Sequence, residues 1–408
     1  MTQTSGKKTP VLGVGVIGLG GAAVAMVPKF AANPGFRIAG AADIDQEVLD
    51  RFKQDFPDAN VYLSAEDLCN DPQVNLIYIA TPNKFHMEHA RMALEGKKHV
   101  LVEKPMTVTI EDSEVMINTA ERNGVLLGVN VKHSFEPRIL RMREMVRTGE
   151  FGRLRMINHW RYQDWLYRPR TPEELTPGPG GGILWRQGAH QFDFIRTIAG
   201  GMVRTVRGQA SVWDPSRRVP GAHVAYLEFE DDVFVTAVYT GADHWDSREL
   251  VQGVGREGVF PDPKRHASAR RELSKATDPD WEASAARAER YGLGRSSGQG
   301  GGGQMAGGGS GWILGGPFIA SFDDADVRMT PGGLVVYGNE ERTEIPLATE
   351  HDGRDGRINT FYDAIVGERP LPADGRWGLG TLEVILGIEE SGRQRKEIYL
   401  THQVPTVD

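Results

Sequence analysis

The first third of the chain alternates short apolar runs with stretches that have the periodicity of helices. The apolar, β-branched runs predict strands at residues 11–17, 36–42, 76–80, 99–102 and 125–129, and the stretches between them predict helices at 46–56, 84–95 and 110–123. This order of elements is typical of βαβ units that share one parallel sheet. We therefore expect an α/β domain over residues 11–130, preceded by a tail of residues 1–10.

The pattern changes after residue 130. A helix is predicted at 138–148, and strands with alternating apolar and polar positions are predicted at 154–162, 203–213, 223–230, 233–239, 326–329 and 334–337. Such alternation indicates strands buried on one face, as in antiparallel sheets. We expect residues 131–408 to form an α+β domain with a large, mainly antiparallel open sheet that binds substrate and supports oligomerisation.

Charge and cysteine content exclude several classes of protein. A net charge of −8 argues against a nucleic-acid partner, because binding phosphates needs a basic surface. One cysteine, Cys69, allows neither an internal disulfide nor a cysteine-rich zinc site, so we expect a cytoplasmic protein without a metal. No apolar run is long enough to predict a membrane span. The segment 11–27 could instead be the core of a signal peptide.

Glycine is strongly over-represented. The chain has 50 glycines, where average usage predicts about 29. Residues 292–316, inside an insertion at about 256–316, hold 13 of them in 25 positions. This composition resists a single conformation. It suggests a mobile flap or an inter-subunit loop, or a tolerated surface insertion.

A smaller set of glycines follows the first predicted strand. Gly18-Leu19-Gly20-Gly21-Ala22-Ala23 matches the Gly-x-Gly-x-x-Gly/Ala fingerprint of Rossmann domains, in which the backbone approaches a pyrophosphate. We expect residues 18–22 to bind the phosphates of a dinucleotide. Asp43 and Ile44 follow the second strand, where a carboxylate accepts the ribose hydroxyls of NAD and repels the 2′-phosphate of NADP. The alternative role for Asp43 is that of a helix N-cap.

Two further clusters follow later strands, at the sheet edge where such folds bind ligands. Thr81, Pro82, Asn83 and His86 follow the third, and Glu103-Lys104-Pro105 follows the fourth. With this triplet and the glycine turn, the chain resembles the Gfo/Idh/MocA family of NAD(P)-dependent oxidoreductases over residues 11–400. The resemblance implies that these residues contact NAD.

The resemblance also implies two catalytic residues. Residues 180–193, Gly-Gly-Gly-Ile-Leu-Trp-Arg-Gln-Gly-Ala-His-Gln-Phe-Asp, look like the family's helix that brings a histidine to the substrate, which makes His190 the proton partner of Lys104. A lysine desolvated beside nicotinamide has a lowered pKa and can act as a base near neutral pH. The alternatives are a surface lysine and a core histidine.

Arg186 departs from the family pattern, which has an aspartate four residues before the histidine. Positions i and i+4 share one helix face, so we expect Arg186 to project beside His190. A guanidinium there suits a carboxylate better than a sugar hydroxyl. The alternative is an arginine that pairs with Asp193 or another neighbouring acid.

Three more residues are candidates for the substrate pocket. Asn130 and His133 follow the last predicted strand of the first domain. Arg161 lies in a stretch of aromatic residues and arginines, a composition that also suits a subunit interface. The helix at 180–193, the glycine-rich insertion and Asp374-Gly375-Arg376-Trp377-Gly378 look most like family members that oxidise phthalate cis-4,5-dihydrodiol to 4,5-dihydroxyphthalate.

We therefore expect an NAD-dependent dihydrodiol dehydrogenase of aromatic catabolism that forms a homodimer or homotetramer. The alternatives are a family enzyme acting on a sugar, an inositol or another dihydrodiol, and a non-catalytic sensor that binds a dinucleotide.

Overall fold

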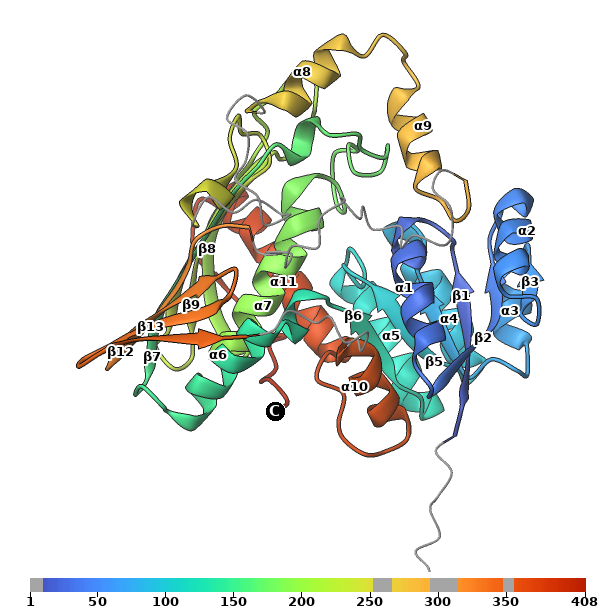
Figure 1. Ribbon diagram of the computed structural model, residues 1–408, viewed down its shortest axis with the longest axis horizontal. Helices are drawn as coiled ribbons and strands as arrows, with labels where there is room; N and C mark the ends of the chain where they lie inside the picture. The colour runs from blue at the N-terminus through green and yellow to red at the C-terminus, as the bar shows by residue number, and fades with distance from the viewer. Residues whose placement is uncertain (1–9, 252–265, 294–314, 348–355) are drawn as a thin grey trace, which may run out of the picture.

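The computed structural model describes residues 10–251, 266–293, 315–347 and 356–408 (Figure 1). Within these ranges the strands form two sheets. The first has six parallel strands in the order β3-β2-β1-β4-β5-β6, as expected for a Rossmann domain. Its strands are β1 (Leu12–Ile17), β2 (Phe36–Ala42), β3 (Asn60–Tyr62), β4 (Leu76–Ile79), β5 (His99–Glu103) and β6 (Leu127–Asn130).

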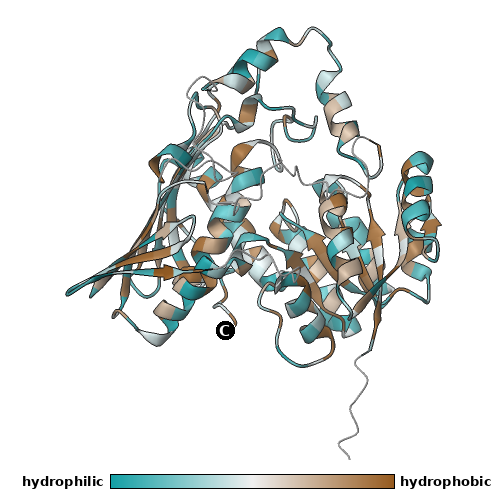
Figure 2. Ribbon diagram, in the orientation of Figure 1, coloured by the Kyte–Doolittle hydropathy of each residue, from teal (hydrophilic) through white to brown (hydrophobic). Residues whose placement is uncertain are grey.

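Helices connect these strands and cover both faces of the sheet. They are α1 (Gly21–Ala32), α2 (Gln46–Asp55), α3 (Ala65–Asn70), α4 (His86–Glu95) and α5 (Ile110–Asn123). Figure 2 shows apolar residues concentrated on the strands between them. The segment 11–27 forms β1 and the start of α1, with Val14 and Val16 fully buried, so it is part of the folded core and not a signal peptide.

The second sheet has nine strands in the order β14-β13-β12-β11-β7-β10-β9-β8-β15. They are β7 (Leu154–Tyr162), β8 (Val203–Ser211), β9 (Ala222–Phe229), β10 (Phe234–Thr240), β11 (Phe318–Phe322), β12 (Ala325–Thr330), β13 (Gly333–Gly338), β14 (Arg342–Pro346) and β15 (Ile398–Tyr399). All neighbouring pairs are antiparallel except β7 with β10. The sheet is therefore mainly antiparallel, as the sequence predicts.

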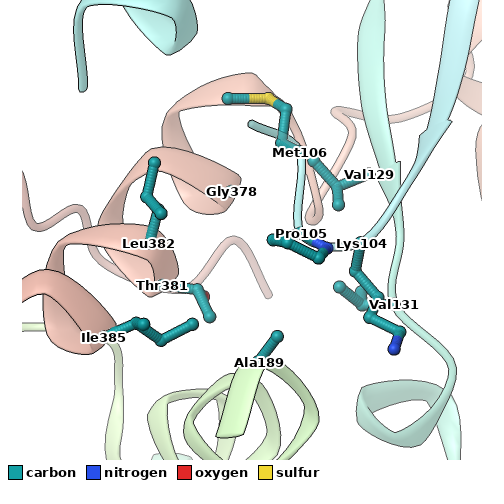
Figure 3. Close-up of a pocket in the computed structure, with 10 residues that line it drawn as sticks. All are labelled: Lys104, Pro105, Met106, Val129, Val131, Ala189, Gly378, Thr381, Leu382 and Ile385. Atoms are coloured by element: carbon teal, nitrogen blue, oxygen red, sulfur yellow. The ribbon is translucent and has the colours of Figure 1, made fainter. Parts of the chain in front are cut away.

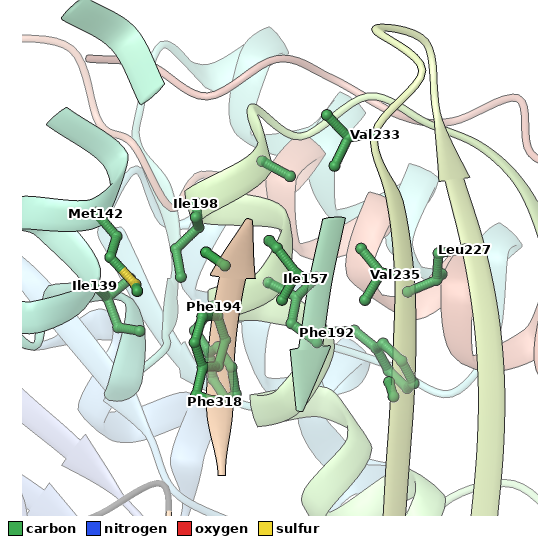
Figure 4. Packing of buried hydrophobic residues seen from close by; sticks show 14 of the residues in the cluster. Ile139, Met142, Ile157, Phe192, Phe194, Ile198, Leu227, Val233, Val235 and Phe318 are labelled. Atoms are coloured by element: carbon green, nitrogen blue, oxygen red, sulfur yellow. The ribbon is translucent and has the colours of Figure 1, made fainter. Parts of the chain in front are cut away.

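Helices α6 (Pro137–Thr148), α7 (Ala189–Ala199) and α11 (Gly375–Gln394) lie on one face of this sheet (Figure 1). Phe192 and Phe194 of α7 point into the strands, where Phe194 meets Phe318 with ring centroids 6.0 Å apart (Figure 4). Helix α11 also packs against α5 and β6, so it joins the two sheets. These helices place α7 at the boundary between the two parts of the molecule.

The remaining helices are α8 (Ser268–Lys275), α9 (Trp281–Ala288) and α10 (Gly356–Ile365). Figure 1 shows α8 and α9 arching from the second sheet toward α1 and α2. Residues 294–314, which contain most of the glycine-rich stretch, lie outside the described residues. No helix in the described part of the chain is long and apolar enough to cross a membrane.

Candidate active site

The glycine turn after β1 has the geometry of a phosphate-binding loop. Gly18 has φ +87°, and a side chain there would come within 2.9 Å of the Thr81 methyl group. A Cβ at Gly20 would meet nothing within 4 Å, so the space in front of the turn is open. Helix α1 begins at Gly21 without a side-chain cap, which leaves its N-terminal N–H groups available to an anion. These residues fit the pyrophosphate of a dinucleotide.

Asp43 lies directly after β2 and beside this turn. Its Oδ2 accepts a hydrogen bond from the Leu19 N–H (2.8 Å), and its Oδ1 accepts one from the Asp45 N–H (3.0 Å). Asp45, not Asp43, caps α2, so the N-cap alternative does not apply to Asp43. The next residue, Ile44, is 90% exposed.

Sequence reasoning missed the residue that pairs with Asp43. Arg290 donates to Asp43 Oδ1 at 2.6 Å, although 247 positions separate them. The only sequence signal is the charged, helix-prone stretch 281–290, and nothing in it indicates which acid it meets.

His86 joins the two loops that follow β4 and β5. It is fully buried, its Nε2 lies 2.9 Å from the Thr81 carbonyl oxygen, and its Nδ1 lies 3.0 Å from that of Pro105. The buried Nδ2 of Asn83 has no hydrogen-bond partner among the described residues, so it is available to a ligand. His86 thus connects Thr81 to the turn that follows Lys104.

Lys104 lies in a buried environment at the end of β5. Burial lowers the pKa of its amine from the ordinary value to about 8, against the opposing effect of Glu103. Its Nζ donates to the Arg186 carbonyl oxygen at 3.0 Å. The peptide bond to Pro105 is cis. A small, mainly apolar cavity adjoins this turn, lined by β6, α7 and α11 (Figure 3).

Glu103 and Asn130 form a polar network beside Lys104. Glu103 accepts a hydrogen bond from the Tyr78 hydroxyl (2.6 Å) and another from the Asn130 amide. The Asn130 oxygen accepts one from Arg357 of α10 (2.9 Å). Asn130 is thus held between Glu103 and Arg357, a residue that the sequence did not indicate.

His190 and His133 lie next to each other, with ring centroids 4.6 Å apart. Burial lowers the pKa of both imidazoles well below the ordinary value, and nearby cations, Lys132 and Lys104 among them, lower it further. Both rings are therefore neutral near pH 7. His133 Nδ1 is buried and has no hydrogen-bond partner among the described residues.

Contacts from Asp193 hold this pair in position. Asp193, one turn after His190, accepts a hydrogen bond from Trp377 Nε1 at 2.7 Å and another from Ser134, the neighbour of His133. Trp377 belongs to α11, whose N-cap is Asp374. The motif at 374–378 thus anchors the histidine helix.

Arg186 lies in a π-helical turn, Leu184–Gly188, that precedes α7. Its guanidinium pairs with Glu173 at 3.0 Å, so a neighbouring acid does pair with it, as one of the sequence alternatives supposed. The side chain is nonetheless only 14% exposed. Its buried Nε has no hydrogen-bond partner among the described residues. The backbone of Arg186 thus contacts Lys104, while its guanidinium pairs with Glu173 and keeps an unbonded donor.

The structure places Arg161 in a different cluster. Its guanidinium is buried, pairs with Asp246 and donates to the Gly315 carbonyl oxygen at 2.6 Å. The aromatic residues that follow are also internal, with Trp165 and Tyr167 nearly fully buried. A role for Arg161 in binding substrate stays a prediction, and both terminal nitrogens of its guanidinium already bond to protein groups.

Comparison with known proteins gives consistent matches along the chain. Residues 12–131 match the family model described as "Oxidoreductase family, NAD-binding Rossmann fold", and residues 139–260 match that of the "GFO/IDH/MocA C-terminal domain". A Comamonas testosteroni protein named 1-carboxy-3-chloro-3,4-dihydroxycyclohexa-1,5-diene dehydrogenase is 36% identical over 93% of this chain and 94% of its own length.

Solved structures agree with these matches. A Bordetella bronchiseptica RB50 protein described as a dehydrogenase is 33% identical, with a TM-score of 0.84 over 95% of this chain and 100% of its own. The WlbA dehydrogenase from Bordetella pertussis, in complex with NADH and UDP-GlcNAcA, is 16% identical, with a TM-score of 0.69 over 96% of this chain and 98% of its own, a likeness of fold.

The fold and these matches define an NAD(P)-dependent oxidoreductase with an NAD-binding Rossmann fold. The chain belongs to the Gfo/Idh/MocA family.

Proposed function

We propose that this protein oxidises a cis-dihydrodiol of an aromatic diacid, phthalate cis-4,5-dihydrodiol, to the corresponding catechol. The observation that carries the proposal is the position of Lys104, whose amine has a lowered pKa and donates to the backbone carbonyl of Arg186. The positive charge of Arg186 contributes to that lowering, and the Nε of its guanidinium has no hydrogen-bond partner among the described residues. A general base near a guanidinium that can bind a carboxylate suits a diol that carries acid groups. The Comamonas relative, whose name describes a carboxylated cyclohexadiene diol, supports the same substrate class.

Each group has a role in this proposal. NAD would be held by the glycine turn and the loops after β2, β4 and β5, and it would supply the hydride acceptor. The residues that would bind it or support these loops are 18–22, Asp43, Ile44, Thr81–Asn83, His86 and Glu103. Lys104 removes the hydroxyl proton, and His190 hydrogen-bonds the same oxygen. Arg186 binds a carboxylate, and His133 and Asn130 complete the pocket. The ketone that forms then tautomerises to a catechol, and aromatisation makes the oxidation effectively irreversible.

A substrate panel tests the proposal. Purified protein and NAD are mixed with phthalate cis-4,5-dihydrodiol, with a monocarboxylated dihydrodiol, with uncharged benzene cis-dihydrodiol and with myo-inositol, and NADH absorbance is followed. We expect the fastest NADH formation with the diacid. Faster reaction with inositol or the uncharged diol would favour a sugar or general diol dehydrogenase. NADH binding without turnover of any of these compounds would favour a non-catalytic sensor.

We further propose that the chain divides into the domains expected from the sequence, at about residue 130, and that it forms a homodimer or homotetramer in the cytoplasm. The outer face of the nine-stranded sheet supports self-association. It carries partly exposed apolar residues on five strands: Trp160, Val224, Tyr226, Phe234, Ile319 and Tyr337. Apolar patches of this kind commonly mark protein interfaces.

A further inference from the structure

The segment Trp281–Leu293, which we call the strap, lies across the dinucleotide-binding edge of the N-terminal sheet. It consists of α9 and the turn that follows, and it reaches that edge from the second sheet (Figure 1). Near its start, Glu282 accepts hydrogen bonds from the Arg170 N–H (2.9 Å) and from the Arg217 guanidinium (2.8 Å). These contacts tie the strap to the second domain.

Tyr291 fastens the other end of the strap to the N-terminal domain. Its backbone N–H donates to the Leu19 carbonyl oxygen (3.0 Å), inside the glycine turn, and its hydroxyl donates to Asp55 (2.7 Å). Its ring is buried against Phe52, with centroids 5.4 Å apart. The strap is therefore held at both ends, and the residue before Tyr291 has a defined place.

That residue, Arg290, contacts the carboxylate expected to bind the adenosine ribose. One guanidinium nitrogen lies 2.6 Å from Asp43 Oδ1, and the other lies 3.1 Å from Asp45 Oδ2. In Rossmann folds the acid after the second strand binds the ribose 2′-hydroxyl. A ribose placed against Asp43 would therefore also lie beside Arg290.

The contact with Arg290 changes the net charge of the site where the adenosine ribose of a cofactor would bind. An isolated aspartate repels a 2′-phosphate, whereas an arginine at the same place accommodates one. The Arg290 guanidinium compensates the Asp43 carboxylate and keeps N–H donors beyond the two that these contacts use. The Arg290 side chain is 26% exposed and that of Asp43 only 6%, so the cation is the more accessible of the two groups.

We propose that Arg290 is a cofactor-specificity residue that binds the 2′-phosphate of NADP, so that the protein accepts NADP alongside NAD. Asp43 serves the unphosphorylated ribose, and the strap supplies the cation from the other domain. The proposal depends on the cofactor site of the proposed function and not on its substrate. It can therefore be tested by binding alone.

The test compares the binding of NADH and NADPH by titration calorimetry, without substrate, in the wild-type protein and in Arg290→Gln. We expect the wild-type dissociation constants for the two cofactors to lie within about tenfold of each other. Loss of a charge-assisted contact should weaken NADPH binding by about tenfold or more in Arg290→Gln. NADH binding should change by less than about threefold, because NADH has no 2′-phosphate for Arg290 to bind.

Tyr291→Phe is the matched control, because it removes the strap's hydrogen bond to Asp55 and leaves Arg290 unchanged. We expect its ratio of NADPH to NADH affinity to equal that of the wild type. The proposal is overturned if wild-type protein binds NADH but not NADPH, or if Arg290→Gln weakens both cofactors equally. A selective loss of NADPH binding in Tyr291→Phe would overturn it too, since strap position would then explain the effect.

Discussion

At the residue scale, burial explains how Lys104 can act as a base. A solvated lysine is protonated at neutral pH, whereas burial brings the pKa of Lys104 to about 8. The neighbouring imidazoles of His133 and His190 have pKa values well below the ordinary one, so they add no positive charge near pH 7. The site therefore combines a titratable amine with two neutral hydrogen-bonding rings.

This environment predicts the pH dependence of the reaction. Only the neutral amine accepts a proton, so kcat/KM for diol oxidation should rise with pH along a limb whose apparent pKa is near 8. Lys104→Ala should lower kcat by roughly 10²–10⁴-fold and abolish this limb. Lys275→Ala, at an exposed position on α8, is the control and should leave the profile unchanged. An unaltered limb in Lys104→Ala would assign the titration to another group.

Arg186 gives a paired prediction, because its partner Glu173 can be changed separately. Arg186→Ala should raise KM for the diacid about tenfold or more, since a charge-assisted hydrogen bond is lost. Glu173→Gln removes the competing carboxylate and should lower that KM or leave it unchanged. Arg91→Ala, which removes an exposed pair with Glu95 in the N-terminal domain, controls for the loss of an arginine. Unchanged diacid kinetics in Arg186→Ala would contradict the carboxylate-binding role.

At the element scale, local patterns predicted most strands and helices but not the contacts between distant ones. Apolar alternation identified β7, β9 and β10, whereas β3 is only three residues long and β11 follows the glycine-rich stretch, so neither stood out. The Asp193–Trp377 hydrogen bond spans 184 positions, and no local periodicity encodes such a pairing. Motifs thus indicated the candidate site residues, but no motif indicated the distant contacts that hold them.

The glycines of α11 show why this helix can pack so closely on the N-terminal sheet. A Cβ at Gly378 would lie 2.6 Å from a Val129 methyl group and 3.3 Å from the Met106 sulfur. Gly378→Ala should therefore destabilise the protein by about 1–3 kcal/mol, measured as a lower Tm. At Gly392 the same change meets only contacts of 3.4 Å or more, so higher helix propensity should leave Tm unchanged or raised. Equal Tm values for the two variants would contradict this packing.

At the scale of the whole molecule, α6, α7 and α11 cover one face of the large sheet, and we expect a second subunit to cover part of the other face. Phe234 and Tyr226, in neighbouring strands of that outer face, are each 40% exposed. We expect wild-type protein to be dimeric or tetrameric by light scattering and Tyr226→Lys to shift it toward monomer. Leu63→Lys, at an exposed apolar position beside β3, is the control and should not shift it. A monomeric wild-type protein would contradict this expectation.

The central claim is that the pocket around Lys104, His190 and Arg186 selects an acidic diol. The most direct test is the ratio of kcat/KM for phthalate cis-4,5-dihydrodiol to that for benzene cis-dihydrodiol, at saturating NAD. With charge-assisted bonds to the carboxylates worth roughly 1.5–3 kcal/mol each, we predict a ratio of about 100 or more. A ratio near one would contradict the claim.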